Sequence, residues 1–171
     1  MGVSGSGKTF VGRLLAERLE CDFLEGDRRH PWQNIQKMQS QRPLGDEDRH
    51  QWLLAIEEDM QRAIAKNRET VITCSALKAA YRKQLSSLER VQLVWLNVPR
   101  EDLARRLQRR VNHYMKLEML DSQLAAFEPV NPNENVLTIN GRFLPAKIVD
   151  ELLSQATWLY PDLEKTWWQR V

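Results

Sequence analysis

Two spacings of apolar residues follow one another along this chain. Apolar positions every three or four residues are typical of helices with one buried face, and compact β-branched runs are typical of buried strands. The first spacing predicts helices at residues 8–19, 31–38, 47–66, 77–85, 99–110, 117–127 and 145–156. The compact runs predict strands at residues 21–27, 70–74, 91–97 and 136–140. Strands that alternate with helices indicate an α/β fold, with a parallel sheet and helices on both faces.

Two of these helices have clear apolar faces. The face of the helix at 31–38 consists of Trp32, Ile35 and Met38. The stripe of the helix at 47–66 consists of Trp52, Leu53, Ile56, Met60 and Ile64. A turn at 43–46 precedes the longer helix and ends in an aspartate, a residue type that commonly caps helix N-termini. We therefore expect Asp46 to be the N-cap.

A phosphate-binding loop opens the chain and precedes the first helix. The residues that fit the pattern G-x-x-x-x-G-K-[ST] are Gly2, Val3, Ser4, Gly5, Ser6, Gly7, Lys8 and Thr9. Glycines let successive backbone amides approach an anion, and the positive end of the helix dipole adds to the attraction. In such loops the lysine reaches the β- and γ-phosphates of ATP, and the hydroxyl ligates Mg²⁺. The loop alone therefore predicts a bound nucleotide phosphate with Mg²⁺, and Thr9 as the metal ligand. Such a loop normally follows a buried parallel strand, whereas only Met1 precedes Gly2,. We therefore expect either a first strand reduced to a stub or a protein that starts further upstream.

Composition limits the class of protein without identifying it. The chain has 171 residues, a formal net charge of +2 and 42% hydrophobic residues, which suit one domain with a small appendage,. This charge is too small to indicate nucleic acid binding, and no apolar run suggests a membrane span. The two cysteines make no disulfide framework, so we expect the cytoplasm,. Residues 157–171 are rich in tryptophan, and we expect them to form an extension to a domain at 1–156.

Several ordered motifs resemble one kinase family. They are Gly26-Asp27-Arg28-Arg29-His30-Pro31, Pro43-Leu44-Gly45-Asp46, Cys74-Ser75-Ala76-Leu77-Lys78 with Tyr81-Arg82, and His113-Tyr114-Met115-Lys116 followed by Gln123. Together with the phosphate loop, this series closely resembles the gluconokinase family, the small P-loop kinases that phosphorylate D-gluconate. The resemblance runs from Met1 to about Ala156. It implies a three-layer P-loop NTPase fold of the nucleoside-kinase type with a helical lid at about 105–128, D-gluconate as substrate and a possible homodimer.

The resemblance also implies roles for individual residues. Lys8 would neutralise the phosphates, and Asp27, at the end of a strand, would accept a proton from the attacking hydroxyl or orient it. The residues expected to contact gluconate are Asp27, His30, Arg49, Lys78, Arg82 and His113. A planar guanidinium suits a carboxylate, although arginines and lysines on helices are otherwise usually solvated charges. Arg106 and Arg110 share a helix face and would be catalytic lid arginines, unless they belong to a merely basic surface.

Other interpretations stay open on the sequence. Another small-acceptor kinase, of the shikimate or adenylate kinase type, would share the loop, although shikimate kinases usually have a glycine-rich stretch where Cys74 to Lys78 stand. A non-catalytic nucleotide-binding protein is a second alternative, favoured by the short first strand. A basic nucleic acid binder rests only on the arginines at 105–110.

Overall fold

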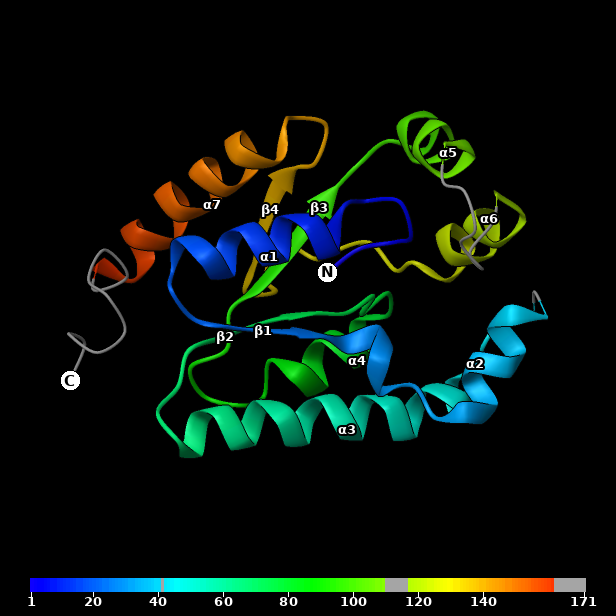
Figure 1. Ribbon diagram of the computed structural model, residues 1–171, viewed down its shortest axis with the longest axis horizontal. Helices are drawn as coiled ribbons and strands as arrows, with labels where there is room; N and C mark the ends of the chain where they lie inside the picture. The colour runs from blue at the N-terminus through cyan, green and yellow to red at the C-terminus, as the bar shows by residue number, and fades with distance from the viewer. Residues whose placement is uncertain (41, 110–116, 162–171) are drawn as a thin grey trace.

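A computed structural model of the chain describes residues 1–40, 42–109 and 117–161 (Figure 1). Helices and strands alternate, as the apolar spacing predicts. The helices are α1 (Lys8–Arg18), α2 (Trp32–Gln39), α3 (Asp46–Ala65), α4 (Ala79–Leu85), α5 (Arg100–Gln108), α6 (Leu117–Ala126) and α7 (Pro145–Leu159), with one 3-10 turn, η1 (Gly26–Arg29). The strands are β1 (Asp22–Glu25), β2 (Thr70–Thr73), β3 (Leu93–Asn97) and β4 (Val136–Asn140). None of the helices described combines the length and apolar character needed to cross a bilayer.

The strands form two parallel pairs. β1 pairs with β2, with Asp22 opposite Thr70, and β3 pairs with β4, with Leu93 opposite Val136. Met1 and Gly2 connect the pairs: Leu96 N donates to Met1 O at 3.1 Å, and Gly2 N donates to Ser75 O at 3.1 Å. The phosphate loop therefore begins beside the carboxyl end of β2.

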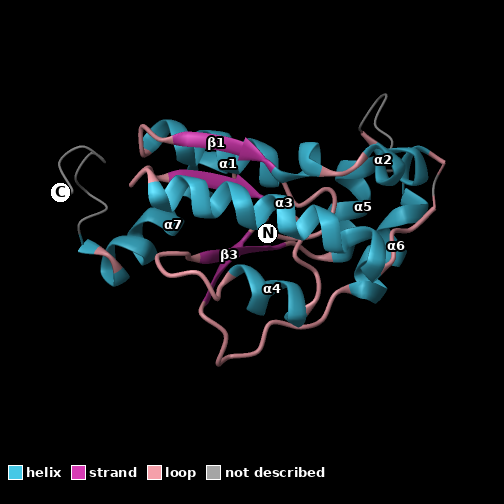
Figure 2. Cartoon of the chain, turned by 90° about the horizontal axis from the view of Figure 1, so that it is seen from below, coloured by secondary structure: helices cyan, strands magenta, loops and turns pink. Residues whose placement is uncertain are grey.

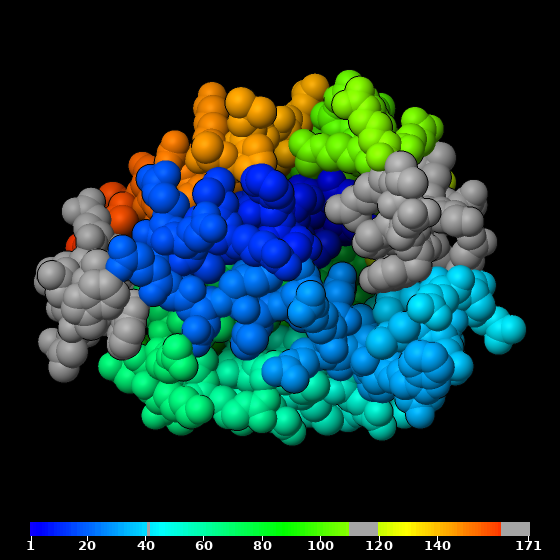
Figure 3. All heavy atoms as spheres, viewed as in Figure 1, coloured from blue at the N-terminus to red at the C-terminus, as the bar shows by residue number. Residues whose placement is uncertain are grey.

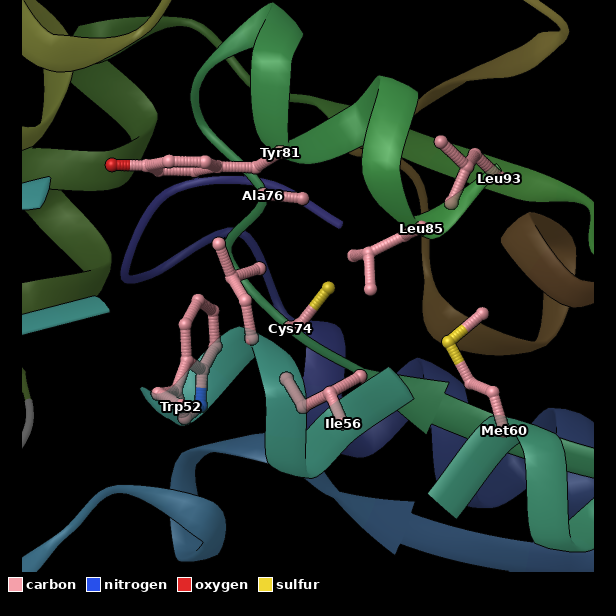
Figure 4. Close-up of a cluster of buried hydrophobic side chains, with 9 residues drawn as sticks. Trp52, Ile56, Met60, Cys74, Ala76, Tyr81, Leu85 and Leu93 are labelled. Atoms are coloured by element: carbon pink, nitrogen blue, oxygen red, sulfur yellow. The ribbon is translucent and has the colours of Figure 1, made fainter. Parts of the chain in front are cut away.

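Helices cover both faces of the strands, because successive strand residues point to opposite sides. Ile72 and Leu93 face a cluster that α3 and α4 complete with Trp52, Ile56 and Leu85 (Figure 4). On the other face, Val71 and Val94 pack against a second cluster, built mainly from α1 and α7. The side chains from these helices are Val11, Leu15, Ile148 and Leu152. The three-layer α/β arrangement predicted from the sequence is confirmed.

A third cluster joins the phosphate loop to α5 and α6. Its buried members are Val3, Leu77, Val98, Leu103, Leu107 and Leu120. In both Figure 1 and Figure 2, α2, α5 and α6 lie at the end of the molecule opposite the C-terminus. The N-terminal end of α1, with its phosphate loop, points toward that same end.

Three local predictions differ from the structure. The N-cap of α3 is Gly45, not Asp46; Asp48 Oδ2 accepts the Gly45 N–H at 2.9 Å, so an acidic residue caps from within the first turn. Trp32 is 62% exposed, so the buried face of α2 rests mainly on Met38. The last helix continues to Leu159, three residues beyond the predicted end at 156.

Candidate active site

The phosphate loop has an open, anion-binding conformation. Gly5 and Gly7 have φ angles of 85° and 97°, which favour glycine, and Gly7 is the N-cap of α1,. A Cβ atom added to Gly7 would meet no atom within 4 Å, so the space above the loop is open there. The N-terminus of α1 therefore presents backbone amides and its positive dipole end to this space, an arrangement that fits a polyphosphate.

Lys8 and Thr9 occupy the first turn of α1. Lys8 Nζ donates to Val3 O at 3.1 Å, so the lysine folds back along the loop. Thr9 is exposed. The described residues contain no group of three or more His, Cys, Asp or Glu side chains that could hold a metal ion alone. Thr9 carries the hydroxyl at the start of α1, which in a loop of this pattern is the group that can ligate Mg²⁺.

Asp27 lies on η1, directly after β1, in a turn that three contacts hold in place. A Cβ atom on Gly26 would lie 2.2 Å from Thr73 O, so only glycine permits this close packing. Trp52 Nε1 donates to Gly26 O at 2.8 Å, and Arg29 binds buried Asp59 with its Nε 2.5 Å from Oδ2. The turn that carries Asp27 is therefore held rigidly against β2 and α3.

Asp27 and Lys8 lie close to one buried thiol, that of Cys74 after β2. Burial raises the pKa of the Cys74 thiol; the positive charge of Lys8 lowers this pKa, and the negative charge of Asp27 raises it. The charges of Lys8 and Asp27 both act on the Cys74 thiol. Asp27, the predicted base, and Lys8, the predicted phosphate ligand, are therefore both near the carboxyl end of β2.

His30 is a neutral hydrogen-bond donor. Its ring stacks on Trp52, with centroids 4.6 Å apart and planes 9° apart. Burial lowers the pKa of His30 to about 4, with Asp27 opposing this shift and Arg49 adding to it. Because the Asn34 amide nitrogen lies 3.3 Å from Nδ1 and can only donate, Nδ1 accepts and the proton sits on Nε2,. His30 can thus donate to a substrate oxygen at neutral pH.

Lys78 and Arg49 form a cationic group around Asp46. Lys78 Nζ lies 2.7 Å from Asp46 Oδ2, and the Tyr81 hydroxyl donates to Asp46 Oδ1. The hydrogen bond from Lys78 lowers the pKa of Asp46, and Tyr81 and Arg49 lower it further. The same bond raises the pKa of Lys78. In Figure 4 the Tyr81 hydroxyl points away from the apolar cluster that holds its ring. This group offers both charges and hydroxyl-binding atoms to a polar ligand.

The prediction that Arg82 contacts substrate is wrong. Arg82 is fully buried, with 0% exposure, and donates from all three guanidinium nitrogens. The acceptors are Glu134 Oε2 and Oε1 at 2.5 and 2.8 Å, and the carbonyl oxygens of Leu77, Glu128 and Pro129 at 3.0 to 3.2 Å. These five bonds use every donor of the guanidinium, so Arg82 joins α4 to the chain that follows α6 and has no donor left for a ligand.

Arg106 lies against the phosphate loop. Its NH1 donates to Gly5 O and Ser6 O at 3.4 and 3.3 Å, and its NH2 donates to Gly141 O at 2.6 Å. This position agrees with an arginine close to phosphate, while its role in catalysis stays a prediction. Arg110 and His113 lie outside the described residues.

Three polar side chains of this region have positions in the structure that the sequence did not predict. Asp46 was expected only to cap α3, and Tyr81 was noted only within a motif. Gln123, on α6, accepts the Ser4 N–H at 2.7 Å. The sequence indicated a role for Gln123 only through its place in the series of family motifs.

Figure 3 shows the atoms of α1 and its loop at the surface, between α5 and α7 on one side and α2 and α3 on the other. Charge effects link the polar groups of this region in series: Lys8 and Asp27 both act on the pKa of Cys74, Asp27 and Arg49 both act on the pKa of His30, and Arg49 acts on the pKa of Asp46. An anionic nucleotide at the loop and a polar, anionic small molecule near Asp46 match these charges.

The chain is similar in sequence and in structure to known proteins. Residues 1–130 match a family model described as an AAA domain. A gluconokinase from Gluconobacter oxydans (strain 621H) is 40% identical over 154 residues, which cover 90% of this chain and 86% of that protein. The crystal structure of a gluconokinase from Sinorhizobium meliloti 1021 superposes with a TM-score of 0.84 at 36% identity, over 100% of this chain and 95% of that one. A shikimate kinase from Aquifex aeolicus vf5, at 18% identity and a TM-score of 0.55, shares the fold alone. With its phosphate loop, three-layer fold and this degree of identity, the chain belongs to the gluconokinase family of P-loop kinases.

Proposed function

We propose that the chain transfers the γ-phosphate of ATP to the 6-hydroxyl of D-gluconate, giving 6-phospho-D-gluconate and ADP. The observation that supports this proposal is that the charges of Lys8, Asp27 and Arg49 act on a linked series of groups, Cys74, His30 and Asp46. Phosphate-loop amides alone would suit any nucleotide-binding protein. A carboxylate base, a neutral donor and two cations in addition to the loop favour a hydroxylated acid as acceptor.

The transfer needs positioning and charge neutralisation more than covalent chemistry. Lys8 and the amides at the start of α1 would hold the phosphates of ATP. Bound Mg²⁺, held through Thr9, would supply further positive charge to the phosphate oxygens. Lys78 and Arg49 would bind the gluconate carboxylate, and His30 Nε2–H would donate to a hydroxyl. The acceptor oxygen then forms a bond to the γ-phosphorus while the bond to the bridging oxygen breaks. ADP leaves with that electron pair, and Asp27 receives the hydroxyl proton.

Two further parts of the proposal concern assembly and location. The possible homodimer rests on the resemblance to the family. The cytoplasmic location rests on Cys21 and Cys74, both within the described residues, which form no disulfide,.

ADP release from Mg-ATP over a panel of acceptors tests the proposal. D-Gluconate should be preferred over shikimate and over nucleoside monophosphates, and no ADP should form without an acceptor. Lys8→Ala and Asp27→Asn should each lower kcat by about 100-fold or more. Asp22→Asn is the matched control, because Asp22 is a carboxylate at the start of β1, paired with Arg68, and should retain full activity.

A greater rate with shikimate or a nucleotide acceptor would contradict the assignment. A folded chain that binds ATP and phosphorylates none of the panel would favour a non-catalytic nucleotide-binding protein.

A further inference from the structure

One side chain from the lid region binds directly to the phosphate loop. Gln123 Oε1, on α6, accepts the backbone N–H of Ser4 at 2.7 Å, across 119 positions of sequence. Ser4 is buried, at 9% exposure. A buried amide without a partner is costly, so this bond stabilises one particular conformation of the loop.

The contacts around this bond hold α5 and α6 against the loop. Leu120 lies one turn before Gln123, has 0% exposure and packs in the cluster that contains Val3. A Cβ atom on Gly5 would lie 3.2 Å from Leu107 Cγ, which shows how closely α5 approaches the loop. Gln123 on α6 and Arg106 on α5 are therefore the polar parts of a larger contact, which is mainly apolar, between these two helices and the loop.

The Gln123 bond leaves the anion-binding amides available. Within the part of the chain that the structure describes, Ser6 N donates to Val3 O at 3.3 Å, whereas the amides of Gly5 and Gly7 have no such bond. Both of these glycines have positive φ angles. The loop is thus rich in glycine, which is flexible. Gln123 fixes its first half at Ser4 and does not occupy the amides of Gly5 and Gly7.

We propose that Gln123 is a positioning residue of the phosphate loop, which holds the Ser4 amide so that the following amides are preorganised for the polyphosphate of ATP. Preorganisation increases affinity because less conformational entropy is lost on binding. The inference takes ATP as the nucleotide from the proposed function and does not depend on the identity of the acceptor. It also makes α6 and the phosphate loop move as one unit.

Amide hydrogen exchange of Ser4, measured by NMR without nucleotide, tests the bond itself. Gln123→Met keeps the length of the side chain and its helix propensity but removes the oxygen; Gln123→Glu keeps an acceptor oxygen. Exchange at Ser4 should accelerate by about 2- to 10-fold in Gln123→Met and stay near the wild-type rate in Gln123→Glu. Equal exchange rates in wild type and Gln123→Met would overturn the proposal.

Mg-ATP binding, measured by calorimetry without acceptor, tests the consequence. Gln123→Met should weaken binding by about 2- to 10-fold. In turnover assays the KM for ATP should rise while the KM for the acceptor stays constant. Gln84→Met is the matched control, because Gln84 is also half-buried on a helix and bonds a side chain, Glu57, away from the loop.

Unchanged or tighter ATP binding in Gln123→Met would contradict the proposal; tighter binding would mean that Gln123 blocks the loop. A loss of affinity of the same size in Gln84→Met would show a general effect of stability and also overturn it. Failure of the gluconate assignment would instead appear as missing turnover in the wild type, with these binding results intact.

Discussion

Lys78 and Arg82 stand four residues apart at the start of α4, and the structure uses the two cations in opposite ways. The Lys78 side chain is 29% exposed and binds the exposed carboxylate of Asp46. The Arg82 side chain is 1% exposed and binds Glu134, whose pKa falls to about 2 because of the bond from Arg82. Both residues belong to one family motif and were predicted to bind substrate. The difference shows that a cation of a family motif can be exposed and available to a ligand, or can be buried and bind backbone carbonyl oxygens that hold the surrounding segments together.

The partners of Arg82 explain its position. Its acceptors on Glu128, Pro129 and Glu134 all lie after α6, and Glu128 Oε2 also accepts the Ala79 N–H at 2.6 Å. This network joins the N-terminus of α4 to the chain that follows α6. Lys78 is the N-cap residue of that same helix. Arg82 therefore positions the end of α4 from which Lys78 extends.

The largest expected effect separates Arg82 from a ligand-binding residue. Arg82→Met should lower the free energy of unfolding by about 3–5 kcal/mol, because it leaves Glu134 and three carbonyl oxygens without their donor. Urea unfolding measures this change. The control is Arg100→Met, which removes the exposed ion pair with Asp121 and should cost less than about 1 kcal/mol,. An Arg82→Met protein of wild-type stability that has lost only gluconate affinity would reverse our correction.

Lys78→Met should weaken gluconate binding and leave the stability of the fold nearly unchanged, in contrast to Arg82→Met. The KM for gluconate should rise by about 10- to 100-fold, as expected for the loss of a charge-assisted hydrogen bond, and stability should stay near that of the wild type. Steady-state kinetics and urea unfolding of the same preparation provide both numbers. Lys147→Met, on α7 over Phe143, controls for loss of a surface charge. Our account of Lys78 fails if its loss destabilises the fold and leaves the KM unchanged.

Tyr81→Phe tests the third member of the group around Asp46. The ring would remain in its apolar cluster, and only the hydroxyl that donates to Asp46 would be lost. We expect the KM for gluconate to rise by about 2- to 10-fold with an unchanged KM for ATP. A change in the KM for ATP alone would place Tyr81 outside the acceptor site.

The effect that is smallest at neutral pH concerns His30, because it appears only in acid. Its pKa is about 4 in the folded chain, below the unfolded value of 6.5, so between these values the unfolded state binds more protons,. Stability should fall as pH drops from about 6.5 to 4, by at most about 1.4 kcal/mol per pH unit from this group. His30→Gln should reduce that slope, and above about pH 7.5 the two stability profiles should run parallel. Identical pH profiles for the two proteins would mean that His30 is not buried as a neutral ring.

The sequence predicted the elements well, because helical and strand spacing is a local property. The phosphate loop and α1 lie where the motif placed them, and each predicted strand overlaps an observed one. The prediction of a single sheet was less accurate: the described strands form two pairs, joined through Met1 and Gly2.

The errors at the site share a physical cause. Arg82 pairs with Glu134, Ser4 with Gln123, and Asp46 with Tyr81, and each pair is separated by many residues. Neither periodicity nor a motif reports which side chains meet across such distances. Asp27 and His30 were easier to place, because they follow a strand directly and all parallel strands end at the same edge of the fold.

Phosphorus NMR of the product formed from Mg-ATP and D-gluconate tests the central claim most directly. We predict that ATP signals are replaced by those of ADP and of one new phosphomonoester, split by the two protons of a primary carbon, as a phosphate on the 6-hydroxyl requires. Lys8→Ala should give no such signal. ADP with inorganic phosphate alone, a phosphomonoester on a secondary carbon, or no reaction by a folded chain that binds ATP would contradict the account.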